Sequence, residues 1–419
     1  MTIPHDTPDG SRRVGRGFSR AFRSLRRRNY RLFWFGQMIS MIGMWAGEVA
    51  LAWLVLSITD SPAMLGLSVT VRFLPSTVLC PFGGILADRF SKRSLLIVTQ
   101  STQMLLALAL GVLASTGFIS IAFIFVLAAL RGVLDALDVP ARQAFVVEMV
   151  GTEDVGNAVA LNSLQFNVAR IVGPVVGAAL IGTLGIAASF YLNAATFLAV
   201  IGFLFALKTS LLSLAPPASK TPVVRQLREV FAYSYRTPDI MVIFLLVFAI
   251  GTFGYNFMTI LPLLARYVLN SGPTGLGALT SSLGVGSMLA ATWMAYRGVP
   301  TRRLMLTASV VFAVLLIAMG LSRWQWLTMA LLVGLGLSAI LFITTANTRL
   351  QLLAPAALRG RVMGVYTWLF MGTAPLGSLL VGWLAEWTGV QPMVLQTAGV
   401  YAVVVAGALW YARRTARGL

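Results

Sequence analysis

The sequence has little charge, one histidine and one cysteine. Charged residues make up 11% of its 419 positions, against about 25% in soluble domains. A single cysteine, Cys80, excludes an intramolecular disulfide, and a single histidine, His5, excludes a histidine metal site or a histidine proton relay. No G-x-x-x-x-G-K-[ST] loop occurs, so the sequence shows no Walker-type ATP site. These absences argue against an enzyme, and we expect no cofactor.

Hydrophobic residues, by contrast, make up 58% of the chain. A membrane-spanning helix needs about 20 predominantly apolar residues, and runs of that length recur throughout. They predict an all-α membrane protein with twelve transmembrane helices. The predicted spans are Leu32–Ser57, Met64–Ala87, Ser94–Thr116, Ser120–Ala141, Ala158–Leu184, Ala187–Lys208, Ile240–Tyr267, Gly275–Tyr296, Leu304–Leu321, Trp326–Asn347, Val362–Trp387 and Met393–Ala412.

The basic residues predict the orientation of these spans. The formal net charge is +19, yet lysine and arginine sit in short segments between apolar runs. That distribution is typical of cytoplasmic loops rather than of a nucleic-acid-binding surface. The basic segments alternate consistently with twelve spans, so both termini are predicted to be cytoplasmic. We expect a multi-pass protein of a bacterial plasma (inner) membrane, with membrane lipids as partners and no nucleic acid.

A long polar stretch after the sixth span divides the chain. The predicted parts are a basic cytoplasmic N-terminal segment (1–31), an N-terminal six-helix bundle (32–208), a cytoplasmic linker (209–239), a C-terminal six-helix bundle (240–412) and a cytoplasmic tail (413–419). The two bundles echo each other weakly, because the fifth and eleventh spans open on similar Gly-led segments and carry Pro174 and Pro375 about fifteen residues later. Internal repeats of this kind are typical of secondary transporters.

The segment "GGILADRFSKR", between the second and third spans, resembles the signature loop of the major facilitator superfamily. The matching residues are Gly84, Asp88, Arg89, Lys92 and Arg93, and serines replace two further motif positions. The resemblance implies the major facilitator fold, with two pseudo-symmetric six-helix bundles. It also assigns the five residues to a conformational latch against the eleventh helix. A plain basic loop would explain the cations but not Asp88.

A second resemblance narrows the branch. "RNYRLFWFGQMIS", "DVPARQAFVVEMV" and "NAVALNSLQFNVARIVGP" look like the branch of enterobactin exporters and macrolide-efflux proteins. Gly173, Pro174 and Gly177 match the core of the superfamily's antiporter motif, and Ala178 replaces the glycine that usually follows. The resemblance implies export by antiport, and an ordinary proline kink is the alternative reading.

Ionisable residues at membrane depth are costly and usually functional, and the first half contains five that we expect to act in proton coupling. Glu48 and Arg72 lie on consecutive spans, about 24 and 22 Å from the cytoplasmic side at 1.5 Å per residue, so we expect them to contact each other. Arg131 and Asp135 share a face of the fourth span, and Arg170 of the fifth span could pair with Asp135. Either Glu48 or Asp135 would carry the proton, and the arginines would tune it.

The expected cargo is a hydrophobic or amphipathic small molecule. Aromatic, amide and apolar side chains suit such a ligand, although for each residue taken singly simple helix packing is the commoner explanation. The candidate binding residues are Trp45, Tyr255, Asn256, Asn347, Trp368 and Met371.

Together these observations predict a monomeric secondary transporter that exports a drug-like or siderophore-like molecule by proton antiport and alternating access. Its partners would be the small-molecule cargo and protons. Two alternatives stay open at this point. One is an importer of the same fold, and the other is a lysolipid or lipid flippase.

Overall fold

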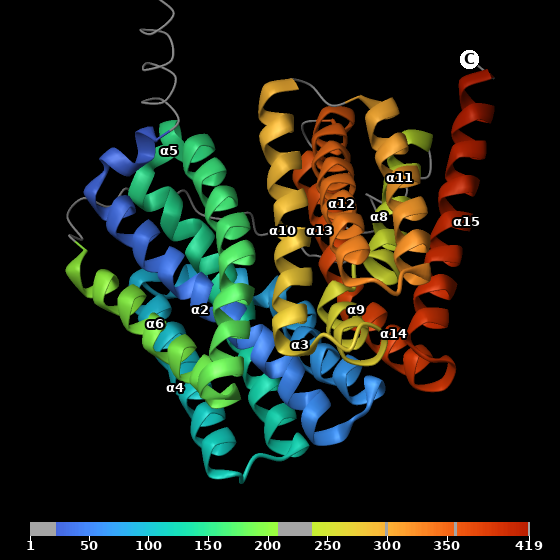
Figure 1. The fold of residues 1–419 in the computed structure, drawn as a ribbon. Coiled ribbons are helices and arrows are strands. Elements are labelled where there is room, and N and C mark those ends of the chain that lie inside the picture. The colour runs from blue at the N-terminus through green and yellow to red at the C-terminus, as the bar shows by residue number, and fades with distance from the viewer. Residues whose placement is uncertain (1–21, 208–236, 298–300, 356–357, 418–419) are drawn as a thin grey trace, which may run out of the picture.

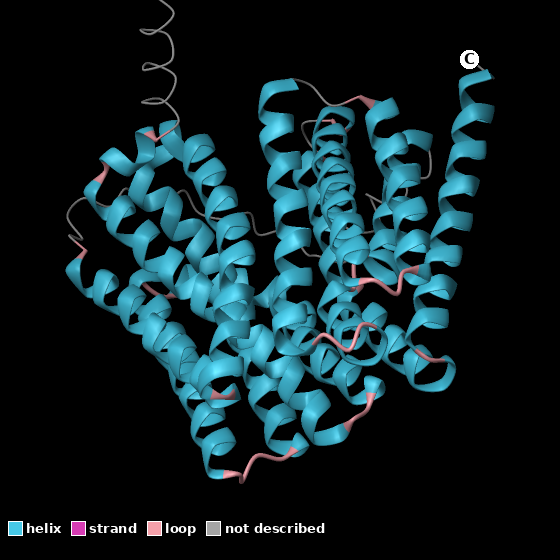
Figure 2. Ribbon diagram, in the orientation of Figure 1, coloured by secondary structure: helices cyan, strands magenta, loops and turns pink. Residues whose placement is uncertain are grey.

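The computed structural model describes residues 22–207, 237–297, 301–355 and 358–417. Within these ranges the side chains of residues 80–89, 297, 413 and 415–417 are not described. The predicted N-terminal segment up to residue 21 and the predicted linker up to residue 236 therefore lie outside the described residues. All regular secondary structure in the described part is helical (Figure 2).

The first half of the protein is built from one short helix and five longer ones. These are η1 (Arg23–Arg26), α2 (Arg28–Thr59), α3 (Pro62–Arg89), α4 (Lys92–Thr116), α5 (Ile121–Leu184) and α6 (Ile186–Ala206). The second half contains α8 (Pro238–Ala249), η3 (Ile250–Gly254), α9 (Phe257–Leu263), η4 (Leu264–Val268), α10 (Gly272–Arg297), α11 (Arg302–Leu321), α12 (Gln325–Leu353), α13 (Arg359–Gly372), α14 (Ala374–Thr388) and α15 (Val390–Arg417). Both η3 and η4 are π-helical turns.

Nine stretches of the described residues are helical, long and apolar enough to cross a membrane. They coincide with the predicted spans one to three, six, seven and nine to twelve. The predicted fourth and fifth spans both fall within α5, which bends at Gly151, and the eighth falls within α10. The all-helical membrane fold is thus confirmed, whereas the count of twelve stays a prediction.

The two halves lie side by side and meet at one end of the molecule. We call this the far end, because it holds the α2–α3 connection, and we call the opposite end, where α2 begins and α15 finishes, the terminal end. In Figure 1 the blue-to-green first half and the yellow-to-red second half approach each other in the lower part. There α3 packs against α14 and α5 packs against α10.

The hydrophobic core follows the same division. One cluster of buried side chains runs through the second half and continues into the first half through far-end residues such as Leu56, Leu65 and Phe190. The terminal-end part of the first half has a separate cluster around Tyr30, Phe145 and neighbouring residues. The shared cluster therefore joins the halves at the far end.

Two spans of the second half are interrupted. The span Pro238–Val268 is α-helical at first, widens into η3, and breaks at Tyr255 and Asn256 before α9. The next-to-last span divides at Thr373 between α13 and α14. The two breaks pack together, because a methyl group on Gly251 would meet the Thr373 side chain. Interrupted helices frame the binding sites of many transporters.

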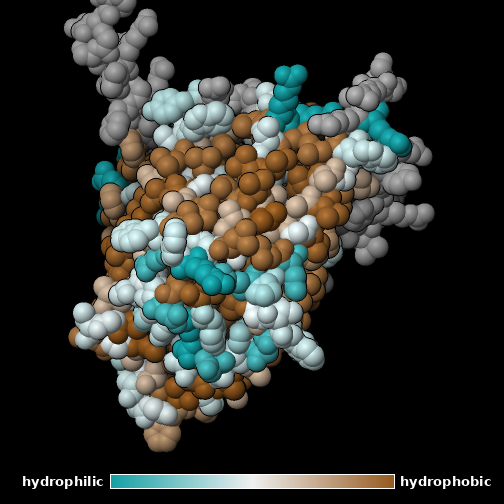
Figure 3. Space-filling view, turned by 45° about the vertical axis from the view of Figure 1, so that its right-hand side comes forward, coloured by the Kyte–Doolittle hydropathy of each residue, from teal (hydrophilic) through white to brown (hydrophobic). Residues whose placement is uncertain are grey.

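The outer surface is apolar, as a lipid-facing surface must be. Large apolar side chains such as Phe118, Leu184, Trp326 and Val403 are more than 70% exposed. Figure 3 shows brown, hydrophobic side chains over much of the face in view. Exposed apolar area of this extent is rare on soluble monomers.

Candidate functional site

Four charged side chains meet inside the first half, and we call them the four-charge cluster: Glu48, Arg72, Arg131 and Asp135. Glu48 Oε2 forms an ion pair with Arg72 Nη1, so the contact predicted from matching depth is present. Glu48 Oε1 lies 3.1 Å from Arg131 Nη1, and Asp135 Oδ2 lies 3.9 Å from Arg72 Nη2. The cluster joins α2, α3 and α5 and is neutral when every member is ionised.

Close helix packing brings the members of the cluster together. A methyl group at Gly132 would overlap the carbonyl oxygen of Arg72, so the absence of a side chain lets α5 approach α3 at this level. The Arg72 side chain is 8% exposed and the Glu48 side chain 13%. Removing such charges from water costs several kcal/mol each, and their mutual pairing offsets that cost.

The two acids of the cluster have different surroundings. Glu48 contacts both guanidinium groups, whereas Asp135 has one arginine at 3.9 Å and accepts a 3.4 Å hydrogen bond from Gln103 Nε2. The Asp135 side chain is 24% exposed, about twice as much as that of Glu48. Neutralising Asp135 would therefore disturb fewer charge–charge contacts than neutralising Glu48.

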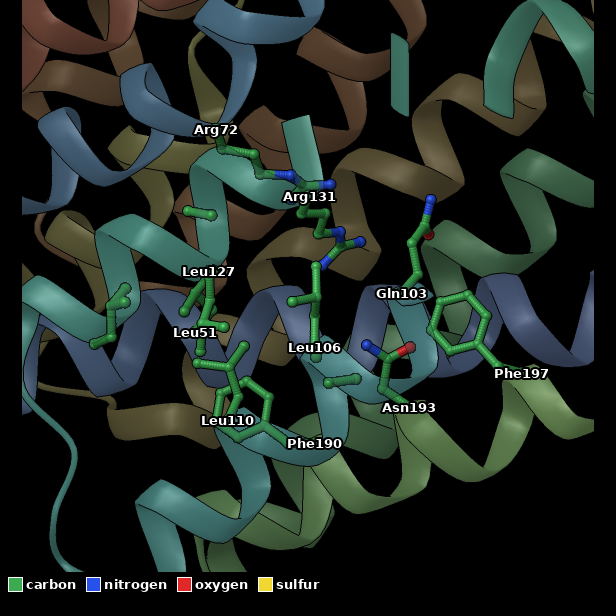
Figure 4. A pocket seen from close by; sticks show the side chains of 14 residues that line it. Leu51, Arg72, Gln103, Leu106, Leu110, Leu127, Arg131, Phe190, Asn193 and Phe197 are labelled. Carbon is green, nitrogen blue, oxygen red and sulfur yellow. The ribbon is translucent and has the colours of Figure 1, made fainter. Parts of the chain in front are cut away.

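A small cavity of about 20 Å³ adjoins the cluster on its far-end side (Figure 4). Its polar lining consists of Arg72, Gln103, Arg131 and Asn193, and its other walls are apolar. The Nε groups of both arginines and Oδ1 of Asn193 have no hydrogen-bond partner among the described residues. A cavity of this volume accommodates one water molecule.

Arg170 does not form the pairing with Asp135 that the sequence allows. Arg170 Nη1 donates to the hydroxyl of Tyr255 at 2.7 Å, and Nη2 donates to Asn167 Oδ1 at 3.0 Å. The reason is that Arg170 lies on the face of α5 that is turned toward the second half, where it meets the break at Tyr255. Asp135 belongs instead to the interior of the first half.

The contacts among the described residues connect only two of the six candidate cargo residues to Arg170, and the set as a whole stays a prediction. Of these two, Tyr255 accepts a hydrogen bond from Arg170 at its hydroxyl group, and Trp45 packs against Phe166, whose ring also contacts the Arg170 guanidinium. By contrast, Asn256 donates to the Thr252 carbonyl oxygen at 2.8 Å and packs against Gly377 of α14.

The remaining three candidates form no hydrogen bond or ring contact with Arg170 in the described part of the chain. Asn347 accepts a hydrogen bond from Gln351, one turn along α12. Trp368 and Met371 on α13 are 55% and 61% exposed. Neither observation brings these side chains to Arg170.

The antiporter-like motif residues lie at two helix interfaces. Methyl groups at Gly173 and Gly177 would collide with the backbone of α2, at Ile42 and Ala46. On the other side of α5, a methyl group at Gly277 of α10 would lie only 2.8 Å from the carbonyl oxygen of Pro174. The motif therefore places α5 tightly between its own half and the other half.

The predicted latch is only partly within the described residues. The side chains of Gly84, Asp88 and Arg89 lie outside them. Lys92 forms an ion pair with Glu148 of α5 at 2.9 Å, and Arg93 Nε donates to the Leu204 carbonyl oxygen of α6 at 2.8 Å. Both described cations thus bind partners in the first half.

A polar contact between the halves at the far end was not predicted. Asp60, at the end of α2, accepts hydrogen bonds from Arg266 Nη2 and Tyr267 Oη, both at 2.8 Å. These hydrogen bonds, first that from Tyr267 and then that from Arg266, hold the pKa of Asp60 below its usual range. Arg266 is one of the few basic residues that the sequence places on this side, which was the available signal.

A second far-end contact involves Glu386 at the end of α14. Its Oε2 accepts from the hydroxyl of Ser61 at 2.7 Å and from the backbone N–H of Ala63 at 3.0 Å. The carboxylate therefore caps the start of α3 in the other half. Within the described residues no group of three or more histidine, cysteine or acidic side chains could hold a metal ion.

Comparison with known proteins gives a consistent result. A family described as "Transmembrane secretion effector" matches residues 19–417. The staphyloferrin A transporter of Staphylococcus aureus is 24% identical over 362 residues, covering 85% of this chain and 90% of that protein. The multidrug efflux pump Tap of Mycolicibacterium fortuitum is 28% identical over 83% of this chain and 87% of its own length. The enterobactin exporter EntS of Citrobacter koseri is 25% identical over 91% and 90%.

Solved structures agree on the fold. A bacterial homologue of the human lysosomal transporter Spinster, in an inward-facing and unoccupied conformation, superposes with a TM-score of 0.69 at 14% identity, over 92% of this chain and 96% of that chain. A POT family transporter in complex with 5-aminolevulinic acid gives 0.74 at 11% identity, over 92% and 96%. At this level of identity the likeness establishes the fold alone.

Proposed function

We propose that this chain, which belongs to the transmembrane secretion effector family of the major facilitator superfamily, is a proton-coupled antiporter that exports an amphipathic small molecule. The relatives include transporters named for siderophores and for multidrug efflux, which supports cargo of either class. The predicted orientation, with both termini cytoplasmic, completes the proposal. Export would then run from the terminal end to the far end.

The observation that carries the proposal is the four-charge cluster. Four ionisable side chains inside an apolar bundle are expensive, and neutral residues of similar volume would stabilise the bundle at least as well. A role in proton transfer explains why the bundle contains these charges. Asp135 is the better carrier, because it has the looser ion pair and lies beside the cavity-lining Gln103.

Proton binding at Asp135 links the net charge of the four-charge cluster to the conformation of the bundle. A neutral Asp135 leaves two guanidinium groups, Arg72 and Arg131, with Glu48 as their remaining carboxylate. The arrangement of α2, α3 and α5 that suits the ionised cluster then becomes unfavourable. A rearrangement that favours one protonation state over the other is the requirement for coupling.

The far-end contacts support alternating access. In this structure the halves are joined at the far end by a shared hydrophobic cluster and by the bonds of Asp60 and Glu386. We assign the structure to the state that is closed at the far end and receives cargo from the terminal end. These contacts would have to break when cargo leaves.

Everted membrane vesicles test the proposal. Two fluorescent probes, dansyl-phenylalanine and ethidium, represent an amphipathic anion and an amphipathic cation. We expect the wild type to accumulate at least one of them, and nigericin, which collapses the pH gradient, to abolish the accumulation. Asp135→Asn and Glu48→Gln should lose gradient-driven accumulation. The matched control is Glu153→Gln, an exposed acid given the same chemical change.

Two outcomes would contradict the proposal. If both cluster variants retain accumulation that nigericin abolishes, the cluster does not couple transport to protons. If probes accumulate in right-side-out vesicles and not in everted ones, the protein is an importer. If the protein moves a fluorescent lysolipid between leaflets and accumulates neither probe, the flippase alternative is favoured instead.

A further inference from the structure

We infer that Arg170 binds a carboxylate group of the cargo, at the place where the two halves meet. The inference rests on the proposed function, because it takes the cargo to pass between the halves. Arg170 is 5% exposed and donates to Tyr255 Oη at 2.7 Å and to Asn167 Oδ1 at 3.0 Å. Both partners are neutral, so no carboxylate among the described residues balances its charge.

Several other cations in the described spans have acidic partners, as the following pairs show. The two arginines of the four-charge cluster share its two acids. Arg142 pairs with Asp138 at 3.0 Å, and Arg349 pairs with Asp239 at 3.5 Å. A neutral amide at position 170 could tie the halves together at a lower desolvation cost. A hydrogen bond between the halves therefore does not require the positive charge of Arg170. An anionic ligand explains why position 170 carries a charge.

A second unmatched donor lies beside the first. Trp45 is 8% exposed, and its Nε1 has no hydrogen-bond partner among the described residues, nor has Nε of Arg170. The Trp45 ring packs edge-on against Phe166 at 5.8 Å, and the guanidinium of Arg170 lies over the same ring at 5.6 Å. Phe166 itself is 41% exposed. Buried donors without acceptors, next to an accessible ring, favour a ligand rich in acceptors.

The opposite wall of the site is formed by an interrupted helix. Tyr255 is half-buried at the break between η3 and α9, and its ring lies 6.2 Å from Phe370, near the break between α13 and α14. Phe370 in turn stacks on Tyr366 with their ring centroids 6.5 Å apart. Aromatic rings from both halves thus flank the guanidinium. They suit a carboxylate attached to an apolar or aromatic body, because a guanidinium binds carboxylates with two parallel hydrogen bonds.

Cargo binding at Arg170 would act on both halves. A carboxylate on Nη1 takes the place of the Tyr255 hydroxyl, which removes a bond between the halves. Trp45 lies three residues before Glu48 on α2, so the two share a helix face. The site is thereby connected to the four-charge cluster through a single helix.

A binding experiment without a proton gradient tests the inference separately from coupling. The full chain in lipid nanodiscs is titrated with dansyl-phenylalanine and with dansyl-phenylalanine amide, which differ only in the carboxylate. We expect the wild type to bind the acid at least about tenfold more tightly than the amide, as charged hydrogen bonds allow. Arg170→Gln should abolish this preference, and Arg170→Lys should keep part of it. Arg302→Gln, an arginine outside the site, should keep all of it.

Tyr255→Phe separates recognition from a structural tie. It removes the competing hydroxyl and keeps the ring, so the preference for the acid should stay at the wild-type level or rise. If Arg170 only ties the halves together, Tyr255→Phe and Arg170→Gln will change the binding of both probes equally. That result overturns the inference, as does a wild-type protein without a preference for the acid, including one that binds neither probe. Neither result bears on gradient-driven transport in vesicles, which judges the proposed function.

Discussion

Replacing Gly66 by alanine should shift the protein away from the far-end-closed state. Gly66 of α3 and Gly382 of α14 cross at the junction of the halves. A methyl group on Gly66 would lie 2.9 Å from Gly382 Cα and even closer to the carbonyl oxygen of Ser378. These are backbone atoms, so the two helices must separate to accommodate it.

The expected magnitude follows from the type of contact. Inserting a methyl group into a tightly packed interface costs about 1–3 kcal/mol. The penalty applies only where α3 and α14 touch, so it acts on the closed state and not on a far-end-open state. A shift of that size changes the ratio of the two states by about 5- to 150-fold.

Labelling of a single cysteine measures the shift. Cys80 is the only cysteine and is replaced by serine. Ser281→Cys then serves as reporter, because Ser281 of α10 is 9% exposed and donates to the Ile171 carbonyl oxygen across the junction of the halves. A membrane-impermeant maleimide added from the far-end side should react faster in the Gly66→Ala background.

The matched control is Gly399→Ala on α15, where a methyl group would meet no atom within 4 Å. It makes the same chemical change without affecting the junction, so labelling should stay at the background rate. Equal labelling rates in the Gly66→Ala and Gly399→Ala backgrounds would refute the reasoning.

Three further predictions concern the charged residues. Glu48→Gln leaves two guanidinium groups in the bundle with only Asp135 nearby and should cost about 3–5 kcal/mol of stability. Asp135→Asn breaks only the 3.9 Å contact with Arg72 and should cost less, and thermal unfolding in detergent ranks the two. Asp60 has a lowered pKa, so its contribution to the far-end contact is present above its ordinary pKa and is lost as the pH falls through the lowered value. The far-end labelling rate of the Ser281→Cys reporter, divided by the rate in Asp60→Asn at the same pH so that the ionisation of the thiol cancels, should therefore rise toward one as the pH falls. Asp88→Asn should increase labelling from the terminal end and slow transport without loss of expression, and unchanged labelling would contradict the latch assignment.

The sequence alone determined that the chain is a membrane protein, where nine of its spans lie, and which two residues form one of its buried ion pairs. Apolar runs of about 20 residues are read directly along the chain, because the thickness of the bilayer fixes their length. Glu48 and Arg72 could be matched because depth in the membrane follows from counting residues along two consecutive antiparallel helices. Unpaired charge at that depth is so costly that equal depth on neighbouring helices was enough to predict the contact.

Only the tertiary structure decided which helix faces meet. The partner of Arg170 could not be decided from the sequence, because residue counting fixes its depth but not whether its face of α5 points toward Asp135 or toward Tyr255 of the other half. The contact of Asp60 with Arg266 spans 206 positions of the chain and depends on how the two halves pack. The sequence likewise did not show that the break at Tyr255 lies beside the break at Thr373 in another span. Rotation of helices about their axes and contacts between separate halves are set by the simultaneous packing of all the helices, which no local pattern in the sequence contains.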